Sequence, residues 1–191
     1  ASAISAGFLL TAVPNWPGRP AFKGWPLIGL VLVWLLARLA WCLPLPALLL
    51  LALQVPFLPL LAWVLGRDLL AAGKRENYPI LLMVALLAGC QALTLLGLAV
   101  DDGNLQRHGV LGALWLVGAL MSVIGGRVIP FFIQRGLNRP PTPAAHPLPG
   151  KVLLVSAMLA AVSFAAGLND VPRMWLALLF ALISGLHLLR L

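Results

Sequence analysis

The chain has 191 residues, of which 62% are hydrophobic and 9% charged, and its mean hydropathy is +1.02. This composition excludes a soluble globular domain, in which about 25% of the residues are charged. The formal net charge of +8 does not indicate a nucleic acid as partner, because the basic residues stand singly in short segments between apolar runs rather than in one patch.

Apolar runs of membrane-crossing length follow one another along the chain. A bilayer core about 30 Å thick takes roughly 20 helical residues to cross. The runs that meet or approach this length are Trp25–Leu43, Ala47–Leu65, Pro79–Val100, Gly109–Ile133, Val152–Leu168 and Met174–Leu191. They are rich in Leu, Ala, Val and Gly and have no alternating polar pattern, which argues against a β-barrel. The sequence therefore predicts an all-α fold, a polytopic transmembrane bundle of about six to seven helices, as a single domain over residues 1–191 in a lipid bilayer.

Both ends of the chain predict a fragment of a larger bundle. The first apolar run, Ala1–Val13, is too short to cross a bilayer and has no basic segment before it, so a secretory signal peptide is not indicated. The last residues, Leu186–Leu191, contain no polar tail. We expect the remaining helices of a full-length protein to pack against this chain. The alternative is a complete chain whose first segment is re-entrant.

Basic residues are distributed unevenly among the connections between the runs. The odd-numbered connections, 14–24, 66–78 and 134–151, together carry eight Lys and Arg residues. The even-numbered ones, 44–46, 101–108 and 169–173, together carry two. Because basic residues accumulate in cytoplasmic loops, we expect the odd connections in the cytoplasm and the even ones outside. The longest connection, 134–151, is rich in proline and is predicted to be an extended cytoplasmic linker.

Two proline-containing motifs are candidate functional sites on the cytoplasmic side. Pro14, Asn15 and Trp16 lie where three prolines and a glycine stop the first apolar segment. Arg127 follows two glycines about 9 Å from the end of its run, and Pro130 is predicted to make that helix end irregular. Such an arginine either extends to the headgroups or holds an anionic group, such as a cofactor propionate, with two parallel hydrogen bonds. Both motifs also fit the simpler reading of two anchored helix ends.

The histidines are candidate metal ligands, although none has a second histidine at helical spacing. His108 lies at the external start of its run and His187 deep in the last one, while His146 lies in the linker. Each is compatible with a structural role or with one axial bond to haem. The two cysteines form no metal-binding pattern, and Gln91 is expected to make an interhelical hydrogen bond. No known catalytic motif occurs, so the sequence indicates no enzymatic activity.

The segments Gly7–Pro20 and Gly125–Ile133 resemble the corresponding motifs of the NnrS family. The resemblance implies an integral protein of the bacterial inner membrane, with haem and copper as cofactors and a role in nitric oxide metabolism or resistance to nitrosative stress. Within the motifs that carry the resemblance, Pro14, Asn15, Trp16, Arg127 and Pro130 are the candidate cofactor-binding residues, and His108 and His187 are the candidate metal ligands that the chain itself offers.

The chain departs from the family in two respects. The histidine-rich stretches that flank this region in the family do not occur in the sequence, so the principal metal ligands are expected outside it. Pro17 stands where the family usually has threonine. The alternatives to an NnrS-like function are a metal-free small-solute transporter and a membrane scaffold subunit.

Overall fold

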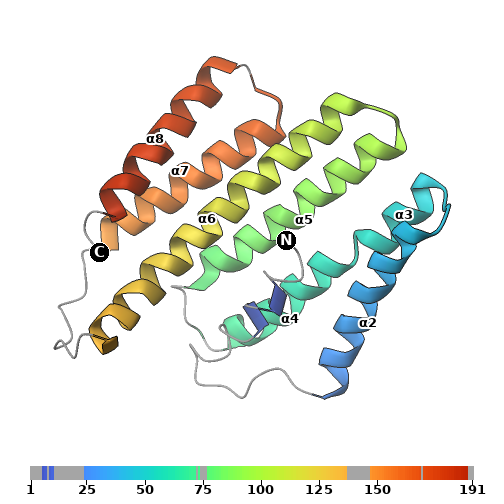
Figure 1. The fold of residues 1–191 in the computed structure, drawn as a ribbon, viewed down its shortest axis with the longest axis horizontal. Coiled ribbons are helices and arrows are strands. Elements are labelled where there is room, and N and C mark those ends of the chain that lie inside the picture. The colour runs from blue at the N-terminus through green and yellow to red at the C-terminus, as the bar shows by residue number, and fades with distance from the viewer. Residues whose placement is uncertain are drawn as a thin grey trace. The chain divides into compact units, whose positions relative to one another are not determined.

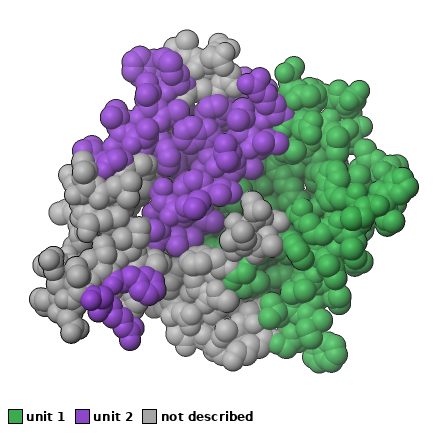
Figure 2. All heavy atoms as spheres, viewed as in Figure 1, with its two compact units in different colours: residues 1–106 green, residues 107–191 purple. Residues whose placement is uncertain are grey.

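The computed structural model describes residues 6–7, 9–10, 24–71, 73, 77–136, 147–168 and 170–188. The regular elements among these residues are all helices (Figure 1), which confirms the all-α prediction. The chain divides into two compact units, unit 1 over residues 1–106 and unit 2 over residues 107–191 (Figure 2).

The elements of unit 1 whose bounds the structure describes are α-helices, with one short 3₁₀-helix after the first of them. These are α2 (Trp25–Leu39), η1 (Ala40–Cys42), α3 (Ala47–Gln54), α4 (Phe57–Ala71) and α5 (Tyr78–Ala99). Proline stands in the first turn of α2 and of α5, where its missing N–H costs no hydrogen bond. The buried side chains of α5, such as Met83 and Val84, form the core of this unit. Helices α4 and α5 lie side by side in Figure 1.

The predicted run Ala47–Leu65 is not one straight helix, because the chain breaks at Val55 and Pro56. Pro56 and Pro59 have no amide hydrogen, so the helical hydrogen bonds to the carbonyls four residues earlier cannot form. The helical path resumes directly, since the Leu60 amide donates to the Pro56 carbonyl at 3.0 Å. Helices α3 and α4 therefore follow each other as one helical segment that is interrupted at Val55 and Pro56.

The connection between α5 and α6 is much shorter than the predicted loop over residues 101–108. Helix α6 (Gly103–Gly136) begins six residues before the predicted Gly109. The cause is Asp102, whose Oδ1 accepts hydrogen bonds from the amides of Asn104 at 2.9 Å and Leu105 at 3.1 Å. A side-chain oxygen in this position satisfies the free amides of a helix start.

The structure differs from the prediction at the C-terminal end of α6. Its backbone remains helical through Pro130 to Gly136, so the Arg127 cluster does not form an irregular helix end. The predicted linker over residues 134–151 is also too long, since α7 (Pro147–Ala165) takes up its last residues. Proline is accepted in the first turn of a helix, which explains why Pro147 and Pro149 begin α7. Residues 137–146 lie outside the described part.

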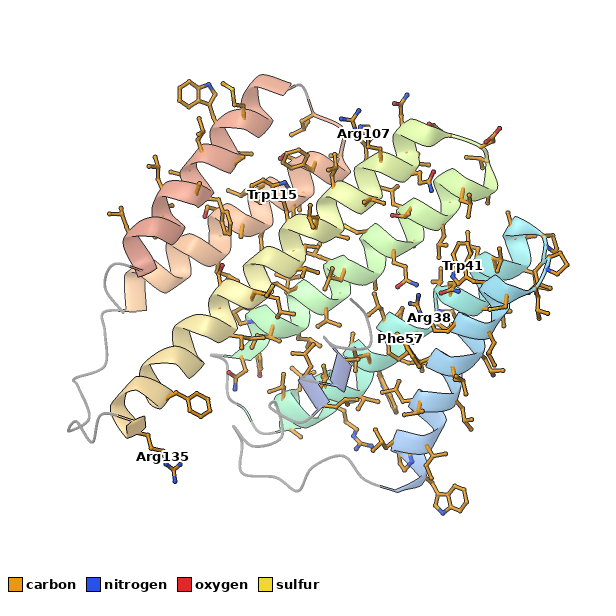
Figure 3. All side chains as sticks on the ribbon, viewed as in Figure 1. Arg38, Trp41, Phe57, Arg107, Trp115 and Arg135 are labelled. Carbon is orange, nitrogen blue, oxygen red and sulfur yellow. The ribbon has the colours of Figure 1, made fainter. Side chains whose placement is uncertain are left out.

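Unit 2 consists of most of α6 together with α7 and α8 (Asp170–Leu188). The Trp115 ring of α6 (labelled in Figure 3) stacks on Phe164 of α7 with a centroid distance of 5.5 Å, and it contacts Phe180 of α8 edge-on at 5.4 Å. Helices α7 and α8 run side by side in opposite directions (Figure 1). Fully buried small residues of α7, among them Ala157 and Ala160, permit this close approach.

Four described helical segments are long and apolar enough to cross a membrane: Trp25–Cys42, Ala47–Ala71, Tyr78–Ala99 and Gly103–Gly125. They agree with the first four predicted runs. The last two runs correspond to shorter apolar segments, Leu154–Ala165 and Met174–Ile183, within 19-residue helices.

Candidate functional site

Most of the predicted site residues lie where the structure gives no side-chain information. Pro14, Asn15 and Trp16 fall outside the described residues. Arg127 and Pro130 lie on the helical backbone of α6, and His187 on that of α8, without described side chains. The expected proximity of the two cytoplasmic motifs therefore stays a prediction.

His108 is the predicted metal ligand whose side chain is described. It is partly buried in the second turn of α6, where its ring covers Gly167 at the turn between α7 and α8. Gly167 has a φ of +66°, and the neighbouring Leu168 amide donates to the Ser163 carbonyl at 3.1 Å, as at a glycine-terminated helix. A Cβ atom on Gly167 would lie 2.7 Å from Cε1 of the imidazole. The imidazole thus packs over a helix end.

No three His, Cys, Asp or Glu side chains come together as a possible metal site in the part of the chain that the structure describes. His108 consequently has no companion ligands there. One imidazole can supply one axial bond to a haem iron. No group of further ligands stands beside it among the described side chains.

A layer of polar groups joins three helices of unit 1. Gln54, which is 3% exposed at the end of α3, donates from Nε2 to the Ala37 carbonyl of α2. Gln91 of α5 donates from Nε2 to the main-chain oxygen of Gln54 at 2.7 Å, which confirms the expected interhelical hydrogen bond. Thr94 instead bonds within its own helix, to the Cys90 carbonyl at 2.8 Å.

Arg38 and Trp34 lie on α2 next to this layer, and neither is among the predicted site residues. The guanidinium carbon of Arg38 lies 6.0 Å from the centroid of the Trp34 ring, a cation–π contact (Figure 3 labels Arg38). Trp34 is about 12 to 14 Å from either end of the segment Trp25–Cys42. The signal that would have found the pair is an arginine inside an apolar run, with tryptophan one turn before it.

The Trp34 indole is incompletely satisfied. Its Nε1 is buried and has no hydrogen-bond partner among the described residues. Tryptophan and arginine carry only donors, so the cation over the ring cannot satisfy this N–H. Arg38 is exposed and stands four residues before the end of the segment at Cys42. The pair therefore combines a buried indole donor with an arginine near the end of a helix.

The second tryptophan–arginine pair of unit 1 has the same spacing and stands at the same distance from the end of its segment, at Ala71. Arg67 lies 6.0 Å from the Trp63 ring centroid near the end of α4. Trp63 is 64% exposed. Tryptophan and arginine at a helix end are typical membrane-interface anchors, so this pair needs no ligand to explain it.

Comparison with known proteins identifies the family. The family model described as NnrS protein matches residues 1–191. No curated protein and no solved structure matches the chain. The family match covers every described helix and both motifs named from the sequence, and the long apolar helices agree with a membrane protein. The chain belongs to the NnrS family.

Proposed function

We propose that the protein is a multi-pass protein of the bacterial inner membrane that binds haem and copper and acts in nitric oxide metabolism or in resistance to nitrosative stress. The observation that carries the proposal is the NnrS family match over residues 1–191. The apolar segments of 18 to 25 residues support the membrane location. No enzymatic reaction is proposed.

The described residues fit only part of this cofactor set. His108 offers one imidazole for a haem iron, and haem requires one or two axial ligands. A copper site with three His, Cys or carboxylate ligands has no counterpart among the described side chains. We therefore place the copper ligands and any second haem ligand, as part of this proposal, on residues other than those with described side chains.

The experiment that tests the proposal is cofactor analysis of the full-length protein purified in detergent. We expect a haem absorbance band and copper in the metal analysis, in a constant ratio to protein. A strain lacking the protein should grow more slowly than wild type under a nitric oxide donor. Absence of both metals with unchanged tolerance would favour the metal-free transporter or the scaffold subunit instead.

A separate measurement addresses His108. If its imidazole serves only to cover the turn at Gly167, His108→Ala should leave haem content unchanged while lowering thermal stability. If it is an axial ligand, the variant should lose haem or shift its absorbance band, and His108→Gln should not restore it. Haem absorbance and thermal stability can both be measured on the same purified variant, so the two outcomes are distinguishable.

A further inference from the structure

The buried face of α2 places Trp34 beside the break between α3 and α4. Leu30 and Ala37, one turn to either side of Trp34, are buried, and α2 packs against both α3 and α4. The two segments run in opposite directions (Figure 1), and the hydrogen bond from Gln54 to the Ala37 carbonyl fixes their register. Trp34 lies three residues before this bond on α2 and is therefore level with Phe57, three residues after it on the partner segment.

Two polar groups of opposite kind lie at this level. The Trp34 Nε1 is buried and has no hydrogen-bond partner among the described residues, whereas a buried indole N–H usually has one. The Val55 carbonyl loses its α-helical donor, because Pro59 has no amide hydrogen. Val55 has helical backbone angles, φ −62° and ψ −40°, so its carbonyl points along the helix toward the level of Phe57.

The neighbouring carbonyls of this contact receive hydrogen bonds from side chains. Gln54 donates to the Ala37 carbonyl, and Gln91 donates to the Gln54 carbonyl at 2.7 Å. An uncharged molecule that accepts one hydrogen bond and donates another would in the same way satisfy Trp34 and Val55 together. A cation would be repelled by the indole N–H, and an anion by the carbonyl oxygen.

We propose that a water molecule binds at the break, where its oxygen accepts from Trp34 Nε1 and one of its O–H groups donates to the Val55 carbonyl. A water that bridges two buried polar groups is nearly as favourable as a direct hydrogen bond, and two partners are the fewest that such a water usually has. The site lies about 12 to 14 Å from either end of the segment Trp25–Cys42. It does not depend on haem, copper or nitric oxide.

The test is NMR spectroscopy of the full chain, labelled with ¹⁵N at its indoles and placed in phosphatidylcholine nanodiscs. The Trp34 indole resonance is assigned by its loss in Trp34→Phe. The readout is the nuclear Overhauser cross-peak between the Trp34 indole proton and water. Its sign separates a water that stays bound from one that exchanges rapidly at the surface. We expect the sign of a bound water.

The two prolines of the break give a matched pair of variants, and both are exposed, so neither substitution removes a core side chain. Pro59→Ala supplies an amide hydrogen for the Val55 carbonyl, which then no longer needs the water, and we expect the Trp34 cross-peak to be lost. Pro56→Ala supplies one for the Ala52 carbonyl, about one turn earlier, and the cross-peak should remain. Loss of the cross-peak in both variants, or in neither, would overturn the assignment of Val55 as the acceptor.

Trp63 provides the reference for an indole at the surface, since it is 64% exposed. Its contact with water should have the sign of rapid exchange. If Trp34 gives the same sign as Trp63, or gives no cross-peak to water in the wild-type protein, no water is held at the break and the proposal is wrong. A cross-peak from Trp34 to lipid protons in place of water would overturn it as well.

Discussion

At the residue scale, two glycines of α5 that look alike in the sequence have different surroundings. A Cβ on Gly97 would meet the main-chain nitrogen of Gln106 and would lie 2.9 Å from its Cα. A Cβ on Gly89 would meet nothing within 4 Å. The turn from α5 into α6 thus depends on the missing side chain of Gly97, because two backbone segments that touch cannot relax by changing a rotamer.

We predict that Gly97→Ala lowers the free energy of unfolding by about 1–3 kcal/mol, the usual cost of forcing an added methyl into a packed site. Gly89→Ala, on the same helix, should be neutral or slightly stabilising because alanine is the better helix former. Thermal or denaturant unfolding in detergent measures both variants. Equal stability of the two variants would contradict the close packing of α5 and α6 at this turn.

His108 and Gly167 form a second close contact, one that links α6 to the turn after α7. Gly167→Ala is strained twice, by its φ of +66° and by the imidazole against its new methyl group. The left-handed backbone conformation alone costs an alanine about 1–2 kcal/mol. We predict that Gly167→Ala lowers the free energy of unfolding by more than this amount in the wild-type background. When His108→Ala is also present, the loss should be close to this amount. Simple additivity of the two substitutions would show that the ring does not limit the site.

The sequence predicts only some of these residue roles. An aspartate directly before a helix start is a recognisable capping pattern, but the polar residues after Asp102 lead to the prediction of a loop over residues 101–108. The close approach at Gly97 and the lack of a partner for the Trp34 indole among the described residues cannot be predicted from the sequence, because each depends on which atoms of other segments lie nearby. The same limit applies to Arg38, whose position in an apolar run is visible but whose contact with Trp34 is not.

At the element scale, Pro56 and Pro130 have opposite outcomes. Pro56 separates α3 from α4, whereas the backbone of α6 continues through Pro130. Pro59 follows three residues after Pro56, so two helical donors are lost within one turn, while no second proline follows Pro130 in α6. In unit 1, Gln54 and Gln91 supply side-chain hydrogen bonds beside the break. A proline in an apolar run therefore does not by itself predict a helix end.

The glutamines at the break give a test at this scale. We predict that Gln54→Leu and Gln91→Leu each lower the free energy of unfolding by about 0.6 to 1.7 kcal/mol, the range measured for hydrogen bonds between membrane helices. Gln91 bonds to the main-chain oxygen of Gln54, which remains in Gln54→Leu, so the two losses should add in the double variant. Unfolding in detergent measures all three proteins.

A strongly non-additive result would mean that the break itself moves when Gln54 is removed. Gln106, which lies outside this polar layer, provides a control position for the loss of an amide side chain. Its substitution by leucine should not change the coupling between the two other variants. A coupling close to zero supports the two separate hydrogen bonds.

At the scale of the whole molecule, apolar length predicts which segments are helical better than it predicts where the helices end. The runs Trp25–Leu43 and Pro79–Val100 agree with observed helices within a few residues. The run from Gly109 misses the first turns of α6, because residues 103–108 are polar and yet helical. The division into two compact units was not predicted, since it arises from packing and not from composition. The prediction of a single transmembrane domain stays a prediction.

The last prediction concerns the orientation of the helices. It depends on α3 and α4 together crossing the membrane once. The segment Ala47–Ala71 has 25 residues and sufficient hydropathy for that. With eight basic residues in the odd connections and two in the even ones, reporter fusions after Ala72 and Thr142 should lie in the cytoplasm. Fusions after Leu45 and Asp102 should lie outside.

The fusion after Leu45 decides whether the break at Pro56 is a bend or a re-entrant turn. If α3 and α4 returned to the same side, the reporters after Leu45 and Ala72 would agree with each other, while those after Asp102 and Thr142 would still differ. If α3 and α4 together cross the membrane once, Leu45 and Ala72 lie on opposite sides. Because proline removes single helical bonds without reversing the chain, and the Leu60 amide resumes the helical path at Pro56, we expect opposite sides.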